Sequence, residues 1–299
     1  MAEIFAIAGD NPRRTKQNKI RRTESLGFHR RSPPFAKTAK DGAPSSTNDR
    51  DVSGALMRIA VVSDVHGNLT ALEAVIADLR RVGVDEVLQG GDLGYGGARP
   101  AEVVDRVREL GWAGVRGNTD EMLWAPENLR NFAVSASPAM KRLFEMTEEI
   151  RVWTCERLGA ERIAWLKTMS MVQRRGELAL VHASPGDTWR APGRDAKDEE
   201  LRKAFGELKA QVVVYGHIHL PYLREMGEWA VANSGSVNLS YDGDARASYV
   251  VVESGKVDIR RVEYDVEGEV ETVKRSGMPH GEWVAACSRA GRFVAPSEE

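Results

Sequence analysis

From Met57 onward, short apolar runs alternate with amphipathic stretches of helical period, and this alternation restricts the fold more than any other feature of the sequence. Short β-branched runs that do not alternate with polar residues are typical of strands covered on both faces. Such runs, separated by helices of ten or more residues, predict a parallel sheet with helices on its faces. The expected strands are 58–63, 84–91, 112–118, 177–184 and 210–217, with helices at 69–83 and 99–111 between the first three.

The rest of the chain changes character twice. Residues 121–167 are mainly helical in pattern, and a polar helix is expected near 197–209. After Pro221 the pattern indicates short strands and turns, including a hairpin around the ESGK turn at 253–256. We therefore predict an α/β fold, a four-layer α/β/β/α sandwich with two mixed β-sheets flanked by helices. The later strands are expected to form a second, largely antiparallel sheet.

Charge and composition set residues 1–56 apart from the body of the chain. They hold 11 Lys and Arg against 6 Asp and Glu and are rich in Pro and Ser, without a sustained helical or strand period. Such a composition cannot bury enough apolar surface to offset the entropy lost on ordering. We predict a disordered basic N-terminal extension over 1–56, with Met57 as an alternative natural start, and a single domain over 57–299.

Several classes of protein are disfavoured by composition. No apolar run has the length of a transmembrane helix, and the opening residues lack the basic region of a secretory signal. Cys155 and Cys287 are far apart and form no C-x-x-C pattern, so a cytoplasmic location is expected. The net acidic body argues against binding of long nucleic acid. A homo-oligomer stays open.

Polar residues that could bind metal follow every strand expected in the body. Ligands of open α/β sheets gather outside the carboxyl ends of the strands, so these side chains should converge. Each motif alone also suits a turn, a helix cap or a satisfied histidine, but five such strand ends in one chain favour a common site. The residues are Asp64, His66, Asn68, Asp92, Asn118, Thr119, Asp120, His182, His217 and His219.

The residue types indicate the kind of metal. Imidazole, carboxylate and amide oxygen suit manganese, iron, zinc or related ions, and the set contains no thiolate. Seven of these residues are the candidate ligands: Asp64, His66, Asp92, Asn118, His182, His217 and His219. Seven ligands are too many for one structural zinc, and they suit two ions about 3.5–4 Å apart that share a carboxylate.

The order of these motifs resembles that of the calcineurin-like metallophosphoesterase superfamily, whose series is Asp-x-His, Gly-Asp, Gly-Asn-His-Asp or Glu, His, and Gly-His-x-His. The resemblance covers about residues 57–270 and looks closest to the compact bacterial and archaeal branch with phosphodiesterase-like members. In this sequence the series reads Asp64-Val-His66, Gly91-Asp92, Gly117-Asn118-Thr119-Asp120, His182 and Gly216-His217-Ile-His219.

The resemblance implies a ligand set and a mechanism. One ion would be held by Asp64, His66, Asp92 and His219, and the other by Asp92, Asn118, His182 and His217. The ions would be two divalent metals, manganese first, with iron, nickel or zinc as alternatives. A hydroxide bridging them would attack a phosphodiester or phosphomonoester.

Three residues have expected roles beside the ligands, and Thr119 departs from the pattern of the superfamily. Asp120 joins Asp92 and Asn118 as a predicted catalytic residue, although its carboxylate could instead orient a neighbour or cap the next helix. Asn68 and Arg116 are the predicted substrate contacts, with turn and surface positions as their alternatives. The superfamily often has a histidine where this chain has Thr119, and that histidine is thought to help the leaving group depart.

The predicted function is hydrolysis of a small-molecule or nucleotide phosphoester. Hydrolysis of dinucleoside polyphosphates or of phosphoproteins at the same site is the first alternative. A non-catalytic scaffold of the same fold is the alternative from another class, and the complete ligand set argues against it.

Overall fold

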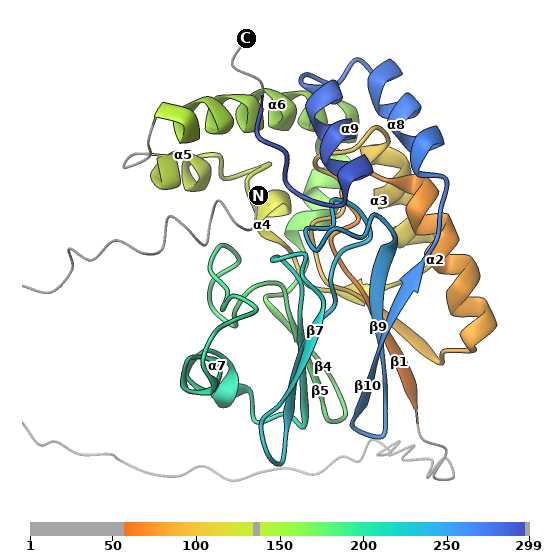
Figure 1. The fold of residues 1–299 in the computed structure, drawn as a ribbon, viewed down its shortest axis with the longest axis vertical. Helices are drawn as coiled ribbons and strands as arrows, with labels where there is room; N and C mark the ends of the chain where they lie inside the picture. Colours follow the sequence, from red (N-terminus) through yellow and green to blue (C-terminus); the bar gives the residue numbers. More distant parts are fainter. Residues whose placement is uncertain (1–56, 134–137, 297–299) are drawn as a thin grey trace, which may run out of the picture. The chain divides into compact units, whose positions relative to one another are not determined.

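The computed structural model describes residues 57–133 and 138–296, and within the described part the core consists of two five-stranded sheets packed face to face (Figure 1). The predicted extension, 1–56, lies outside the described residues. In spatial order, the first sheet consists of β10 (Lys256–Val262), β9 (Ala247–Glu253), β1 (Arg58–Val62), β2 (Glu86–Gln89) and β3 (Ala113–Gly114). The second consists of β4 (Val172–Arg175), β5 (Leu178–Val181), β6 (Val212–Tyr215), β8 (Ala230–Asn233) and β7 (Tyr222–Glu225).

Both sheets are mixed. The strands β1, β2 and β3 run parallel, while β9 and β10 add to β1 as an antiparallel hairpin. In the second sheet β5, β6 and β8 run parallel, with β4 and β7 antiparallel at the two edges. The expectation that the later strands form one separate sheet was therefore wrong, because they divide between both sheets. The predicted four-layer α/β/β/α sandwich with two mixed sheets is confirmed.

Helices cover the outer face of each sheet (Figure 1). Against the first sheet lie α2 (Leu69–Val82), α3 (Pro100–Glu109) and the second half of α6 (Pro138–Lys167), whose helical geometry is interrupted at Gly159. Against the second lies α7 (Asp198–Phe205), followed by the short 3₁₀ helix η1 (Gly206–Leu208). The first half of α6 forms a further apolar cluster with α4 (Asn118–Glu121), α5 (Glu127–Ala133), α8 (Val266–Arg275) and α9 (Gly281–Ala290).

The helix α2 shows how local sequence produces this packing. Leu72, Val75 and Leu79 recur at helical spacing, and all three are buried against the first sheet. Full burial of such side chains contributes about 1.5–3 kcal/mol each. The helix ends at Gly83, whose left-handed φ of 70° allows its N–H to bond Leu79 O at 3.0 Å.

The faces that the two sheets turn toward each other are lined by aliphatic side chains. Ile59 and Val61 of β1 pack with Leu180 of β5 and Val214 of β6 in this central layer. Alternate residues of the same strands, such as Ala60 and Val62, face the helices instead. Both faces of the inner strands are buried, so only the strand ends are left for polar groups. Within residues 57–133 and 138–296, no helix is both long and apolar enough to cross a membrane.

Candidate metal centre

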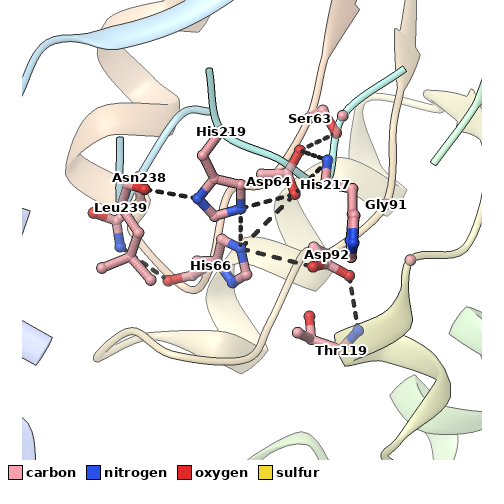
Figure 2. Close-up of polar contacts among 12 residues, drawn as sticks. Ser63, Asp64, His66, Gly91, Asp92, Thr119, His217, His219, Asn238 and Leu239 are labelled. Carbon is pink, nitrogen blue, oxygen red and sulfur yellow. Dashed lines mark hydrogen bonds and ion pairs between the residues drawn. The ribbon is translucent and has the colours of Figure 1, made fainter. Parts of the chain in front are cut away.

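The polar residues that follow the strands meet at the carboxyl ends of β1, β2, β5 and β6. The segment after β3 joins them from the start of α4 (Figure 2). Each predicted metal ligand is at most 5% exposed, so burial is a shared property of the set. The seven are Asp64, His66, Asp92, Asn118, His182, His217 and His219.

Five of these seven predicted ligands have left-handed backbone conformations. In residues other than glycine this conformation costs about 1–2 kcal/mol, because Cβ approaches the carbonyl oxygen. Strain of this kind persists only where the surroundings impose it, and it is typical of functional sites. Here neighbouring loops impose it, since Asp64 N bonds Gly91 O and His66 N bonds Asp92 O, each at 3.0 Å. The φ values are 57° at Asp64, 48° at His66, 57° at Asp92, 66° at His217 and 57° at His219.

His66 and His219 point their Nε2 atoms at each other, 3.2 Å apart (Figure 2). The Nδ1 of His66 lies 2.8 Å from Tyr95 O, and that of His219 lies 2.7 Å from Leu239 O. A carbonyl only accepts hydrogen bonds, so each Nδ1 carries a proton and each ring directs its Nε2 into the site. Burial, with the neighbouring His219, lowers the pKa of His66 to about 3, which keeps that ring neutral. Two imidazole nitrogens therefore face one point, an arrangement that suits a cation between them.

A second cluster forms around Asn118. Its Oδ1 lies 3.0 Å from His182 Nε2 and 2.8 Å from His217 Nδ1. His182 donates from Nδ1 to Gly90 O at 2.8 Å, which directs its Nε2 into the site. The same Nε2 is 3.5 Å from Oδ1 of Asp92. The structure thus brings both predicted ligand groups together.

The two buried carboxylates have different partners. Asp64 accepts bonds from Ser63 Oγ at 2.5 Å and from the N–H of His217 at 3.1 Å, and it lies 3.1 Å from His219 Nε2. Burial alone would raise the pKa of Asp64, but the histidines around it hold that pKa well below its usual range. Asp92 accepts one bond, from Thr119 N at 2.9 Å. Burial, opposed by His182 and reinforced by Asp64, raises the pKa of Asp92 to about 7.

Asp120, predicted as a catalytic residue, is fully engaged with the backbone. Its Oδ2 accepts from the N–H groups of Asp92 at 2.8 Å and Gly117 at 3.0 Å, and its Oδ1 accepts from Leu93 N at 3.1 Å. These bonds tie the loop after β2 to the start of α4. The geometry favours the positioning role that was the alternative for Asp120.

The two predicted substrate contacts lie in different surroundings. Asn68 is completely buried and caps α2, with its Oδ1 accepting from Ala71 N at 2.8 Å. This position favours a role in stabilising the start of α2 over a contact with substrate. Arg116 lies at a cavity wall, where it bonds weakly to Met169 O at 3.4 Å.

Some residues that shape the centre gave no signal in the sequence. The carbonyls of Tyr95, Leu239 and Gly90 fix three imidazoles, and a backbone carbonyl can come from any residue type. Tyr241 stacks on His219 with ring centroids 4.8 Å apart and 14° between the planes. Only the Ser63 hydroxyl, next to a predicted ligand, could have been proposed from its place in the motif.

Gly117 is required by a close approach at this site, and a substitution tests that geometry. A Cβ on Gly117 would lie 1.9 Å from Asp92 Oδ1. We expect Gly117→Ala to displace the carboxylate, destabilise the fold by about 1–3 kcal/mol and weaken metal binding. Gly206→Ala is the control, since a Cβ there meets no atom within 4 Å. Thermal unfolding and metal titration measure both effects, and equal behaviour of the two variants would contradict the packing argument.

The spacing of the donor atoms fits divalent metal. Ligands bound at about 2.1 Å to one ion lie about 3–3.4 Å from each other, close to the 3.2 Å between the two imidazole nitrogens. Among the described residues, two groups have all their donor atoms within 4.8 Å of one another: Asp64, His66 and His219, and Asp64, Asp92 and His182. Nitrogen and oxygen donors of this mixture suit manganese, iron or zinc.

Comparison with known proteins agrees with this geometry. Residues 57–256 match the sequence model of the calcineurin-like phosphoesterase superfamily domain. The uncharacterized protein MJ0912 of Methanocaldococcus jannaschii is 28% identical over 258 residues, which cover 78% of this chain and 98% of that protein. The phosphodiesterase YfcE of Escherichia coli is 25% identical over 214 residues, covering 68% of this chain and 91% of that one.

Solved structures show the same fold. A metallophosphoesterase from Sphaerobacter thermophilus superposes with a TM-score of 0.65 at 27% identity, covering 79% of this chain and all of that one. The hypothetical protein PH1004 from Pyrococcus horikoshii gives a TM-score of 0.67 at 18% identity over 80% of this chain. The protein is a metal-dependent hydrolase of phosphoric esters. The chain belongs to the calcineurin-like phosphoesterase superfamily.

Proposed function

We propose that the protein is a dinuclear metal-dependent phosphoesterase that cleaves small-molecule phosphodiesters, phosphomonoesters or both. One ion would be held by Asp64, His66, Asp92 and His219, and the other by Asp92, Asn118, His182 and His217. Manganese is the first candidate, with iron, nickel and zinc as alternatives. The observation that carries the proposal is that the Nε2 atoms of His66 and His219 face each other at 3.2 Å, each ring held from Nδ1 by a backbone carbonyl.

Asp92 is the proposed shared ligand, although Asp64 belongs to both candidate groups. The two oxygens of Asp92 face different histidines, Oδ2 toward His66 at 3.7 Å and Oδ1 toward His182 at 3.5 Å. Asp64 already accepts bonds from a hydroxyl and a backbone N–H, so fewer of its lone pairs are available. Asp92 is therefore better placed to bind one ion through each oxygen.

The chain's own groups position the reaction. When bound, two divalent ions supply a nucleophilic hydroxide at neutral pH and neutralise charge on the phosphoryl oxygens. Backbone carbonyls orient the imidazoles of His182 and His219, and Asn118 is positioned as the first residue of α4. The guanidinium of Arg116, two residues before Asn118, is available to a phosphoryl oxygen.

Metal reconstitution tests this function. The chelated protein should hydrolyse aryl phosphodiesters or monoesters after addition of Mn²⁺, Ni²⁺, Zn²⁺ or Fe²⁺, and elemental analysis should give two ions per chain. His219→Gln should lose one ion and most activity. His280→Gln is the matched control, since His280 pairs with Glu149 near the surface. One ion in the fully active protein would contradict the dinuclear centre. A panel that includes dinucleoside polyphosphates and phosphopeptides separates the alternative substrates.

A further inference from the structure

We propose that a polar cavity beside the metal centre binds a neutral, hydroxyl-bearing organic group of the substrate, such as a sugar or glycerol. The inference rests on the proposed function and names the substrate class for that site. The cavity has a volume of about 590 Å³. The wall residues on which the argument depends are Arg116, Glu121, Asn128, Asn131, Thr188 and Trp189.

The cavity walls continue the segments that carry two predicted ligands. Arg116 and Glu121 flank Asn118 in sequence, and the loop with Thr188 and Trp189 follows His182. Glu121 fastens these segments together, since its Oε2 accepts from Thr188 Oγ1 at 2.5 Å and from Trp189 Nε1 at 3.2 Å. A phosphoryl group at the metal centre would therefore place one of its ester groups toward this cavity.

Several polar groups in the wall have hydrogen-bonding capacity to spare. Both bonds to Glu121 use Oε2, and within the described part of the chain Oε1 forms none. The side-chain amides of Asn128 and Asn131 likewise bond to no described residue. Arg116 forms no ion pair among residues 57–133 and 138–296, and its buried Nε has no partner.

These polar groups of the cavity wall determine which kind of ligand group the cavity can bind. A carboxylate oxygen and two amides suit hydroxyl groups, which both donate and accept hydrogen bonds. An apolar group would bury Glu121 and Asn128 without partners, which is costly. The wall also holds Asp187 and Arg190, which pair with each other at 3.1 Å, so a second anion would meet the carboxylates of Glu121 and Asp187 and a cation would meet Arg116 and Arg190. Arg116 itself fits the phosphoryl oxygens that every phosphodiester carries. A neutral polyol remains as the complementary group.

Three substrates with one leaving group isolate the cavity from the bond-breaking step. These are the p-nitrophenyl phosphodiesters of methanol, of glycerol and of a ribonucleoside through its 5′ oxygen. We expect kcat/KM of the natural protein to favour at least one hydroxylated ester over the methyl ester by about 10- to 100-fold, the effect of one or two charged hydrogen bonds. The glycerol and ribose arms distinguish the two sources of hydroxyl groups.

Two variants test the assignment of the wall. Glu121→Gln keeps an acceptor for Thr188 and Trp189 but removes the charge, and Asn128→Ala removes one amide from α5. Each should lower the ratio of hydroxylated to methyl ester by about tenfold or more. Glu127→Gln, an exposed change on α5 outside the cavity wall, is the control and should keep the ratio. If Glu121→Gln does not fold, the ratio measured for Asn128→Ala tests the assignment by itself.

The outcomes separate the cavity from the chemistry of the centre. Hydrolysis of all three esters at similar kcat/KM would overturn the cavity assignment and leave the phosphoesterase function standing. A preference that both variants retain would also overturn it. No hydrolysis of any ester with any metal would overturn the proposed function, and this inference with it.

Discussion

Asp92→Asn is expected to lower bound metal from two ions to one or fewer and to reduce kcat by about a thousandfold or more. The substitution keeps the shape of the side chain and its bond from Thr119 N, but it removes the charged oxygens that face His66 and His182. A two-metal clamp is worth several kcal/mol in the transition state, and each 1.4 kcal/mol is about tenfold in rate.

The stability of the same variant separates metal loss from misfolding. Burial already opposes ionisation of Asp92, so the neutral amide should not destabilise the chelated protein. Added Mn²⁺ should raise the melting temperature of the natural protein much more than that of the variant. Asp105→Asn, which removes a partly exposed partner of Arg162, is the control and should bind two ions. Two ions in an active Asp92→Asn protein would contradict the bridging role.

The sequence predicts the location of this centre because the rule that places it is simple. Parallel strands bring their carboxyl ends to one edge of a sheet, so residues after β1 and β2 meet in the first sheet and those after β5 and β6 meet in the second. The packing of the two sheets on each other brings the two sets together. The burial of His182 and Asp92 follows from that edge lying between two sheets. Burial of the ligands thus follows from topology.

The partner of each late strand was beyond sequence reasoning. The hairpin β9–β10 was expected, but an apolar hairpin does not specify which sheet edge it joins. It pairs antiparallel to β1, with Ile59 opposite Val252, while β8 pairs with β6 and β7 pairs with β8. The choice depends on contacts between residues nearly 200 positions apart in the chain.

The sequence also does not predict the roles of the polar residues next to the ligands. Asn68 and Asp120 sit in the same motifs as the ligands, yet their side chains bond to backbone N–H groups. A carboxylate or amide can serve a metal, a substrate or a helix end, and only the backbone geometry decides. The left-handed φ of His66 and His219 is likewise invisible in residue types.

Because Thr119 stands where a histidine is often found, we expect the rate to depend steeply on the pKa of the leaving group. Thr119 is 2% exposed, lies beside Asp92 in Figure 2, and presents a hydroxyl with no hydrogen-bond partner among residues 57–133 and 138–296. A threonine hydroxyl has no useful acidity near neutral pH. Asp120, the nearest carboxyl in sequence, is held by three backbone N–H groups. We therefore expect the departing oxygen to receive no proton from either residue.

Negative charge must then build up on the leaving group in the transition state, so we expect kcat/KM to fall steeply as the leaving-group pKa rises across substituted phenyl phosphodiesters. General acid catalysis typically contributes about 10²–10⁴-fold, which makes its absence measurable in such a series. Thr119→His should restore part of that help and flatten the dependence. Thr119→Val, which removes the hydroxyl without adding an acid, is the control and should keep the steep slope. A shallow slope in the natural protein would mean that another group already protonates the departing oxygen.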